Sequence, residues 1–330
     1  MTSLDFLKNK TILVTGGSGS FGRNFVKYLL NYSQAKKIIV FSRDELKQYQ
    51  MQREITDGRL RFFLGDIRDL PRLERAFHGV DIVLHAAALK QIPALEYNPF
   101  EAVKTNIIGS QNVIEAAIDQ GVKKVLLIST DKAAQPINLY GSTKLCAEKL
   151  FISGNAYAGG ATKFSCARYG NVIGSRGGIV EVLLNRPNSS KVFLTDERMT
   201  RFWIILEQSF ELVSFALKNM AGGEIFIPKI PSMKLMELFE VIAPNAQVEI
   251  IGIRPGEKLH EVLLTGEEAR HAVELKNCFI ILPELFSADK RYKNHLAKGK
   301  KLPAEFCYTS DNNQCWLSKD ELQNIIKKLN

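Results

Sequence analysis

A phenol and an amine stand one helical turn apart in this chain, at Tyr140 and Lys144. On a helix, side chains at positions i and i+4 share one face. A cation beside a phenol favours the phenolate, so Tyr140 could take a proton from a sugar hydroxyl near neutral pH. The pair therefore predicts an enzyme that removes a hydride from a secondary alcohol.

A second acid and base, Asp131 and Lys132, directly follow an apolar run that ends in Ser129 and Thr130. Simple alcohol oxidation needs no such pair, so it indicates a further proton-transfer step. The alternative is an ordinary surface pair, with Lys132 in contact with phosphate or solvent and Asp131 as its partner.

The elements that must position these groups begin near the N-terminus. Residues 11–15 predict a short strand, a glycine-rich loop follows, and a helical pattern runs on to Leu30. Such a loop lets backbone N–H groups and a helix N-terminus approach a pyrophosphate, although an ordinary glycine turn has the same pattern. The cofactor candidates of this loop are Gly16, Ser18, Gly19, Ser20, Phe21 and Gly22.

A second predicted strand, residues 37–42, ends where a dinucleotide fold contacts the adenosine ribose. An acid there favours NAD, whereas a hydroxyl and cations suit the 2′-phosphate of NADP. The chain has Ser42 and Arg43 there, which favours NADP, while Asp44 weakens the distinction. The candidates are Ser42, Arg43, Asp44, Glu45, Leu46 and Lys47.

Further strands alternate with helical patterns, which predicts an α/β fold with a doubly wound parallel Rossmann-type sheet. Ligands of such sheets bind beyond the carboxyl ends of the strands. Asp66 follows one strand and could accept a hydrogen bond from adenine, whereas His85 lies in an apolar run and is predicted to pack in the core. The other candidates at strand ends are Ile67, Ala86, Lys90, Ile128 and Ser129.

We place an NADP-binding domain at residues 1–170 and a smaller C-terminal α/β substrate domain at 171–330, with some segments returning to the first domain. Arg201, Arg254 and Lys258 of the second part could bind a diphosphate, and each could equally be a structural ion-pair partner.

Composition narrows the class of protein. The formal charge is +9, but the basic residues are dispersed, which argues against nucleic acid as a partner. The start of the chain carries acid and base, and no apolar segment approaches membrane-spanning length, so a cytoplasmic enzyme is expected. The five cysteines are scattered, and neither a disulfide framework nor a metal site is expected.

The glycine loop, Thr130 and the Tyr140–Lys144 pair together resemble the extended short-chain dehydrogenase/reductase superfamily that acts on nucleotide sugars. Within it, the chain is similar to the inverting UDP-N-acetylglucosamine 4,6-dehydratases, which open pseudaminic acid synthesis. The similarity extends from residue 8 to residue 325, and the segments that carry it are 42–47, 85–90, 129–134, 138–141, 168–172, 199–203 and 252–261.

The resemblance implies roles for the acid–base residues. Tyr140, assisted by Lys144 and Thr130, would take the proton of the C4 hydroxyl while hydride passes to NADP. Lys132, if kept neutral by a desolvated and cation-rich pocket, would remove the C5 proton, and Asp131 would protonate the departing C6 hydroxyl. Retaining dehydratases have a glutamate where this chain has Lys132, so the resemblance implies inversion at C5.

The resemblance also implies the substrate UDP-N-acetylglucosamine and a homo-oligomer such as a hexamer. The loop between Leu183 and Val192 is shorter than we expect for these enzymes. The substrate contacts carried over by motif are Lys90, Asn171, Val172, Arg176, Thr195 and Arg254.

Two other functions remain open. A UDP-hexosamine 4-epimerase shares the threonine, tyrosine and lysine but has no use for Asp131 and Lys132. A non-catalytic NADP-binding regulator usually loses the tyrosine or the lysine of the pair, and both are present here.

Overall fold

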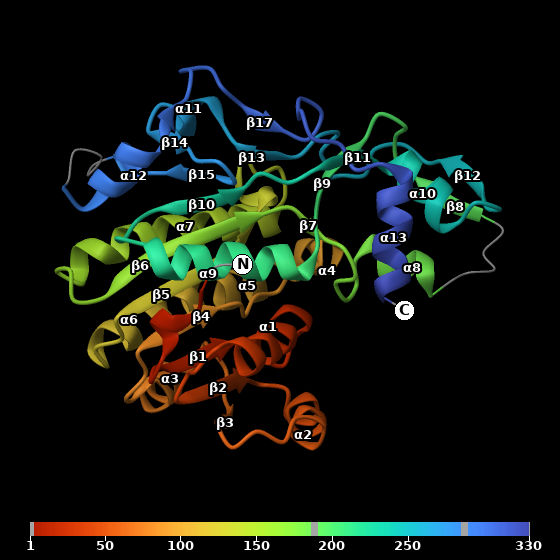
Figure 1. Cartoon of the computed structure of the whole chain (residues 1–330). Helices are drawn as coiled ribbons and strands as arrows, with labels where there is room; N and C mark the ends of the chain where they lie inside the picture. The colour runs from red at the N-terminus through yellow and green to blue at the C-terminus, as the bar shows by residue number, and fades with distance from the viewer. Residues whose placement is uncertain (1–2, 186–190, 285–289, 330) are drawn as a thin grey trace.

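The structure is a computed structural model that describes residues 3–185, 191–284 and 290–329. Within them, ten strands form one sheet in the order β16-β14-β15-β10-β6-β5-β4-β1-β2-β3 (Figure 1). The strands from β3 to β6 are parallel and follow the order of a dinucleotide-binding fold. The predicted doubly wound parallel sheet is confirmed.

The first part of the chain supplies these parallel strands and their covering helices. In chain order they are η1 (Asp5–Leu7), β1 (Thr11–Thr15), α1 (Ser20–Tyr32), β2 (Lys37–Ser42), α2 (Glu45–Glu54), β3 (Leu60–Leu64), α3 (Leu70–Phe77), β4 (Ile82–His85), α4 (Ile92–Tyr97), α5 (Pro99–Ala102), η2 (Val103–Ile108), α6 (Gly109–Asp119), β5 (Lys124–Thr130), η3 (Asp131–Ala133), α7 (Leu139–Tyr157) and β6 (Lys163–Tyr169).

The rest of the chain forms shorter elements. They are β7 (Asn171–Val172), α8 (Ile179–Leu184), β8 (Lys191–Leu194), β9 (Thr200–Ile204), α9 (Leu206–Asn219), β10 (Ile225–Pro228), β11 (Ser232–Lys234), α10 (Leu235–Ile242), β12 (Gln247–Ile250), β13 (Val262–Leu264), α11 (Gly266–Ala269), β14 (Ala272–Glu274), β15 (Cys278–Ile281), η5 (Lys290–Tyr292), α12 (Lys293–Lys298), β16 (Lys300–Lys301), β17 (Tyr308–Thr309) and α13 (Lys319–Leu329).

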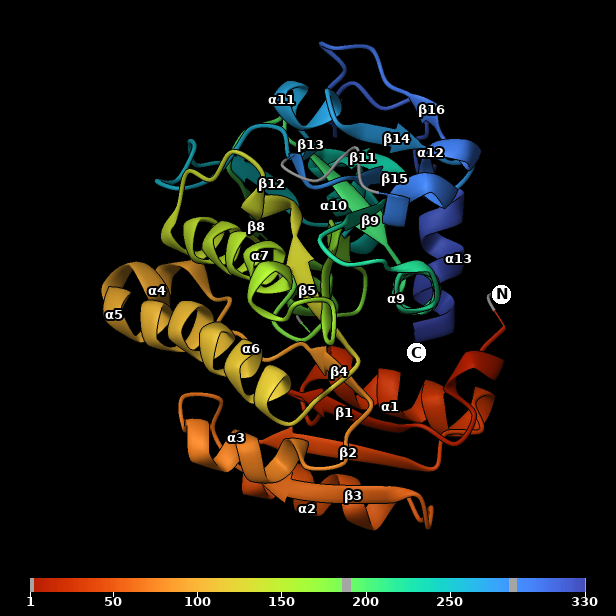
Figure 2. The ribbon, with the colours of Figure 1, turned by 90° about the vertical axis from the view of Figure 1, so that its left-hand side faces the viewer.

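Helices cover both faces of the parallel strands. With the sheet seen edge-on, α3, α4, α5, α6 and α7 lie on one side, and α1 and α9 lie on the other (Figure 2). Every residue of β1 is buried, as expected for a central parallel strand whose apolar run is covered on both faces. None of the helices in the described ranges has the length and apolar character needed to cross a membrane.

Strands from the second half of the chain extend this sheet. β10 lies parallel to β6, and β15 then pairs antiparallel to β10. The sheet therefore contains strands from before and after residue 170 in the sequence, which is the position of the predicted domain boundary.

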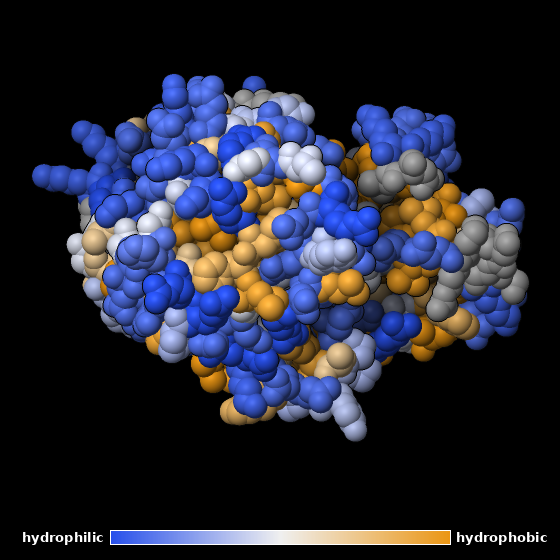
Figure 3. Space-filling view, turned by 90° about the horizontal axis from the view of Figure 1, so that it is seen from below, coloured by the Kyte–Doolittle hydropathy of each residue, from blue (hydrophilic) through white to orange (hydrophobic). Residues whose placement is uncertain are grey.

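A smaller lobe stands beside the sheet and contains α8, α10, α13, β8 and β12 (Figure 1). It has its own apolar core, which includes Val192, Trp203, Leu238 and Leu322. Seen from below, a notch separates this lobe from the main body, and apolar side chains gather on the lobe beside it (Figure 3). Within the loop that we expect to be short, residues 186–190 lie outside the described ranges.

The helical pattern predicted from Val103 begins as a π-helix, η2, which passes directly into α6. The extra residue in such a turn re-aims a side chain. Here Asn106 is buried and donates hydrogen bonds to the Leu89 carbonyl and the Thr143 hydroxyl, and it accepts one from the Leu89 backbone N–H. Asn106 thus ties the segment after β4 to the first turn of α7.

Candidate active site

A cavity of about 510 Å³ opens at the carboxyl ends of the parallel strands. Its wall brings together predicted residues from the first and second halves of the chain. The predicted residues that line it are Gly16, Gly19, Ser20, Phe21, Gly22, Lys47, Ala86, Lys90, Ile128, Ser129, Thr130, Lys132, Tyr140, Lys144, Asn171, Val172 and Arg176.

The glycine loop is closely packed against the strand ends. Gly16 has a φ of +66°, and a Cβ there would lie 2.9 Å from the Ala87 Cα. A Cβ on Gly22 would lie 2.5 Å from the Gly16 carbonyl oxygen. Because only glycine fits these positions, the loop packs tightly and the N-terminus of α1 lies at the cavity wall, which fits the pyrophosphate of a dinucleotide.

The segment after β2 is held by its own contacts. The Ser18 and Ser42 hydroxyls are 2.8 Å apart. Asp44 caps α2 by accepting a hydrogen bond from the Lys47 backbone N–H, and it pairs with the Lys47 ammonium at 2.5 Å. The Asp44 carboxylate, which weakened the choice of NADP, is therefore already bound by the N-terminus of α2 and by the Lys47 ammonium.

Asp66, the predicted adenine contact, pairs with Arg68 at 2.7 Å and with Arg43 at 3.7 Å. Burial would raise its pKa, but hydrogen bonds from Arg68 and the charge of Arg43 outweigh burial and lower it. Asp66 is thus an ionised partner of two arginines, and it lies outside the residues that line the cavity.

Tyr140 and Lys144 share one face of α7 and both line the cavity. The Lys144 ammonium donates a 2.8 Å hydrogen bond to the Ile128 carbonyl, and burial lowers its pKa to about 8. Burial raises the pKa of Tyr140 to about 12, with Asp131 adding to the rise and Lys132 and Thr130 opposing it. The predicted lowering of the phenol's pKa is absent in this state, and the cation that favours the phenolate is Lys132.

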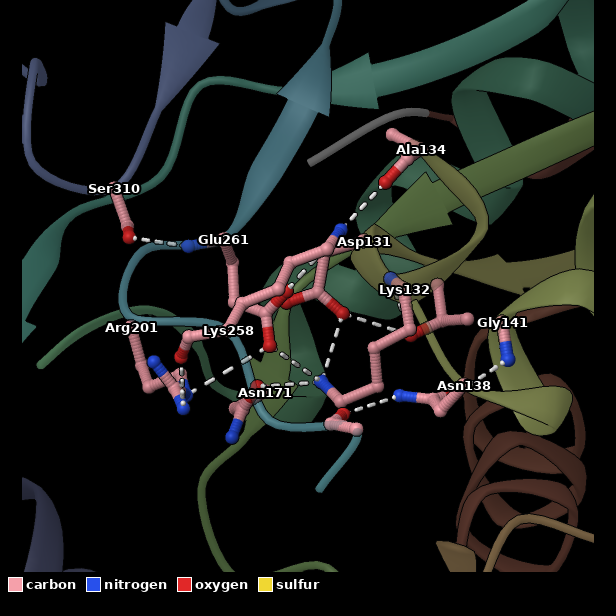
Figure 4. A network of polar contacts seen from close by, with 12 residues as sticks. Asp131, Lys132, Ala134, Asn138, Gly141, Asn171, Arg201, Lys258, Glu261 and Ser310 are labelled. Atoms are coloured by element: carbon pink, nitrogen blue, oxygen red, sulfur yellow. Dashed lines mark hydrogen bonds and ion pairs between the residues drawn. The ribbon is translucent and has the colours of Figure 1, made fainter. Parts of the chain in front are cut away.

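Asp131 and Lys132 form the centre of a buried polar cluster (Figure 4). Asp131 is fully buried, accepts a 2.8 Å hydrogen bond from Thr130 and pairs with the Lys132 ammonium at 3.0 Å. The same ammonium lies 3.4 Å from Glu261 Oε1 and 3.5 Å from Asn171 Oδ1. Lys132 thus lines the first cavity and Asp131 is fully buried beside it, unlike the residues of an ordinary surface ion pair.

The two carboxylates decide the charge of Lys132. Burial would lower its pKa, and Arg201 acts in the same direction, but Asp131 and Glu261 outweigh both and raise it above the ordinary value. Lys132 is therefore an ammonium in this state. The expectation of a neutral Lys132 is wrong here because a second carboxylate, from a distant segment of the chain, faces it.

Local backbone features bring this cluster beside α7. Thr130 caps η3, and Asn138 caps α7 by accepting a hydrogen bond from the Gly141 backbone N–H. Gly141 lies against the Lys132 carbonyl so closely that a Cβ there would clash with it. Asn138 also donates a 2.8 Å hydrogen bond to the Gly256 carbonyl, which anchors the basic loop after β12 to the start of α7.

A second cavity of about 250 Å³ adjoins the first, since Lys132 and Asn171 line both. Arg201, Lys258 and Glu261 lie in its wall. Arg201 donates hydrogen bonds to the carbonyls of Thr200, Leu259 and Lys258, so several of its guanidinium N–H groups already have backbone partners.

The remaining predicted residues lie outside both cavity walls, and the exposed Arg254 is among them. His85, in contrast, is packed as predicted, between Thr15 and Ser110, and burial lowers its pKa to about 3. The predicted site residues outside the walls are Ser18, Ser42, Arg43, Asp44, Glu45, Leu46, Asp66, Ile67, Asp131, Thr195 and Arg254.

Sequence reasoning missed Glu261, because its only sequence signal was an acid within a basic segment far from Lys132. Trp203 and Tyr169, which also line the first cavity, looked like ordinary strand residues.

A family model described as polysaccharide biosynthesis protein matches residues 12–283. The chain belongs to this family. A relative of this chain, the UDP-N-acetylglucosamine 4,6-dehydratase (inverting) of Campylobacter jejuni, is 49% identical over 96% of this chain and 97% of its own length. The resemblance to inverting 4,6-dehydratases is thereby confirmed.

Two further proteins are similar to this chain over almost its whole length. The UDP-glucose 4-epimerase of Rickettsia conorii is 37% identical over 97% of this chain and 96% of its own length. The solved structure of Pen from Bacillus thuringiensis is 41% identical with a TM-score of 0.90, and the match covers 98% of this chain and 100% of that one.

Proposed function

We propose that the protein is an inverting UDP-N-acetylglucosamine 4,6-dehydratase. The observation that carries this proposal is the position of Asp131 and Lys132. They form a second acid–base couple, 3.0 Å apart, and Lys132 shares a cavity with Tyr140. The similarity to the inverting dehydratase of Campylobacter jejuni supports the same reaction.

The cofactor in this proposal is a nicotinamide dinucleotide, and specifically NADP. The closely packed glycine loop supports the dinucleotide, and Arg43, more than half exposed after β2, supports a 2′-phosphate. When bound, the cofactor supplies reversible hydride transfer at C4 and C6 of the sugar. Every proton transfer falls to the side chains of this chain.

Tyr140 takes the proton of the C4 hydroxyl in this proposal. Its phenol has a pKa of about 12 in the resting protein, so the phenolate needs a nearby cation and a hydrogen-bond donor. Lys132 supplies the charge and Thr130 the hydroxyl, while Lys144 fixes the wall of the cavity through the Ile128 carbonyl.

A ketone at C4 makes the C5 proton acidic, and Lys132, which lines the same cavity as Tyr140, is the base that removes this proton. Asp131 receives the C4 proton from Tyr140 through the Thr130 hydroxyl, passes it to the departing C6 hydroxyl, and water leaves. Asp131 Oδ2 supports this role, because this buried oxygen has no hydrogen-bond partner among the described residues. C5 then takes a proton from solvent on the opposite face, which inverts that carbon.

In the substrate half, Lys90, Asn171, Val172 and Arg176 would contact the sugar nucleotide, since all four line the first cavity. Burial lowers the pKa of Lys90, whose ammonium donates to the Arg176 carbonyl. A homo-oligomer and a place at the start of pseudaminic acid synthesis are further parts of the proposal that rest on the resemblance alone.

The second candidate is a UDP-hexosamine 4-epimerase, favoured by the Rickettsia relative that carries the name UDP-glucose 4-epimerase. Both reactions oxidise C4, but only dehydration requires proton transfer at C5. Purified protein incubated with UDP-N-acetylglucosamine is therefore analysed by mass spectrometry. Loss of one water is expected, an unchanged mass with an inverted C4 identifies the epimerase, and Tyr140→Phe is the inactive control.

A further inference from the structure

The resting charge of Lys132 poses a chemical problem that rests on the proposed function. An ammonium has no lone pair with which to remove a C5 proton. The Lys132 ammonium therefore has to release a proton first, and a group that is ionised, buried and close has to accept it. Asp131 is one neighbour, but in the proposed function it already takes the C4 proton through Thr130 and passes it to the departing C6 hydroxyl.

Glu261 is the other carboxylate that faces this ammonium. It is 3% exposed, lies in the wall of the second cavity and places Oε1 3.4 Å from Lys132 Nζ. That separation exceeds a good hydrogen bond by only a few tenths of an ångström, so a small side-chain rotation closes it.

The backbone of Glu261 is fixed on both sides. Its N–H donates to the Ser310 hydroxyl at 2.9 Å, and its carbonyl accepts from the Ser310 N–H at 2.8 Å (Figure 4). Two further cations lie near its carboxylate, Arg201 at 3.7 Å and Lys258 at 3.8 Å. The carboxylate is thus held in one place while it faces Lys132.

One carboxylate oxygen of Glu261, Oε2, lacks a hydrogen-bond donor among the described residues. Within the described residues, Oε2 is buried and accepts no hydrogen bond, a costly state for a carboxylate oxygen. An oxygen with spare capacity at the wall of a cavity can hold a proton that its neighbour gives up.

We propose that Glu261 is a positioning residue of the reaction that accepts a proton from Lys132 and so frees the lysine to act as the C5 base. The Lys132 ammonium gives a proton to Glu261, which leaves a neutral amine and a neutral carboxylic acid. The amine lone pair then takes the C5 proton, and the C5–H electron pair enters the C4–C5 bond as the ketone becomes an enolate. The proton on Glu261 passes to solvent in the second cavity while C5 takes one proton from solvent, so the protons balance and the ion pair forms again.

The experiment compares wild type with Glu261→Gln, using holoenzyme and UDP-N-acetylglucosamine in D2O. The amide keeps the size of the side chain but cannot accept the proton. Deuterium exchange at C5 is expected to fall by about 100-fold or more, the usual contribution of a proton-transfer group. Single-turnover oxidation at C4, followed by nicotinamide absorbance, and the affinity for the sugar nucleotide, measured by calorimetry, are expected to stay within about threefold of wild type, because neither needs the transfer.

Two matched variants separate proton acceptance from charge and packing. Glu257→Gln removes a carboxylate from the same cavity wall, and in the described residues Glu257 forms no ion pair with Lys132. Glu261→Asp keeps a proton acceptor on a shorter side chain. The rate of C5 exchange in Glu261→Asp is expected to exceed that in Glu261→Gln by about tenfold. In Glu257→Gln, the rate of C5 exchange is expected to fall only a few-fold below wild type.

The proposal for Glu261 is overturned if Glu261→Gln exchanges C5 within about threefold of wild type, or if C4 oxidation falls in parallel with exchange. It is also overturned if Glu257→Gln loses as much as Glu261→Gln. If wild type itself neither exchanges C5 nor releases water, the proposed dehydratase function fails, which is a distinguishable result.

Discussion

Two buried clusters in this protein share the same central arrangement of charges but have different surroundings. Each places one cation between two carboxylates: Arg168 between Glu148 and Glu268, and Lys132 between Asp131 and Glu261. The Arg168 side chain is fully buried, whereas 22% of the Lys132 side chain is exposed at the cavity. Charge composition alone therefore does not distinguish a structural cluster from a reactive one.

Completeness of hydrogen bonding does distinguish them. The Arg168 guanidinium donates to both oxygens of each of its carboxylates and to the Leu263 carbonyl. In the Lys132 cluster, Asp131 and Glu261 each retain one buried oxygen without a hydrogen bond among the described residues. The fully hydrogen-bonded Arg168 guanidinium fixes β6 against α7 and α11. The carboxylate oxygens of Asp131 and Glu261 that accept no hydrogen bond can instead accept protons.

The largest expected effect comes from breaking the reactive cluster at its centre. In Lys132→Ala, deuterium exchange at C5 is expected to fall by about 10³-fold or more, because the base is removed. Measurement is by proton NMR of recovered sugar nucleotide in D2O, with a thermal unfolding scan as the control for folding. Exchange at the wild-type rate would refute the assignment of Lys132 as the base.

Breaking the structural cluster should affect stability instead. Arg168→Met leaves two buried carboxylates without their cation, and the free energy of unfolding is expected to fall by about 3–5 kcal/mol. Urea unfolding measures this free energy. Arg168→Lys keeps the positive charge but loses the planar guanidinium, and its free energy of unfolding is expected to lie between those of wild type and Arg168→Met. An unchanged midpoint for Arg168→Met would mean that the cluster does not hold these elements together.

A smaller effect on activity is expected for Asp131→Asn. The amide cannot protonate the C6 hydroxyl, so release of water is expected to fall by about 100-fold. C5 exchange should persist, since Lys132 and Glu261 remain. Parallel measurement of product mass and of C5 exchange checks this, and equal losses in both would contradict separate roles for Asp131 and Lys132.

The smallest effect concerns the pH dependence of stability. Burial would raise the pKa of Glu268, but Arg168 outweighs it and lowers the pKa. The stability that Glu268 contributes is therefore present above the ordinary carboxyl range and is lost as the pH falls through the lowered value. For Lys132, with a raised pKa, the contribution is present below the ordinary lysine value and is lost only at high pH.

Glu268→Gln is accordingly expected to reduce the loss of unfolding free energy between neutral pH and about pH 3, as measured by urea unfolding at each pH. Glu274→Gln, which removes a carboxylate from the partly exposed Lys229–Glu274 pair, is the control and should change this loss less. The same acid dependence in Glu268→Gln and wild type would exclude Glu268 from the stabilising cluster.

The sequence was sufficient for the six parallel strands β1 to β6 and for the strand ends that meet at the first cavity, but not for the four later strands that extend the sheet. Apolar runs such as residues 11–15 and 124–129 predict buried strands, and glycines such as Gly16 indicate where two backbone segments approach closely. The charge state of Lys132 was not predictable, because Glu261 lies far along the chain and reaches it only through the packing of β13 beside η3. The occupation of Asp66 by Arg68 depends on side-chain conformation in the same way.

The most direct test of the account is a proton NMR spectrum of the product that wild type forms from UDP-N-acetylglucosamine in D2O. The expected product is a 4-keto sugar that has lost the C6 hydroxyl and carries deuterium at an inverted C5. A product that keeps its C6 hydroxyl and its C5 proton, with only C4 inverted, would contradict it.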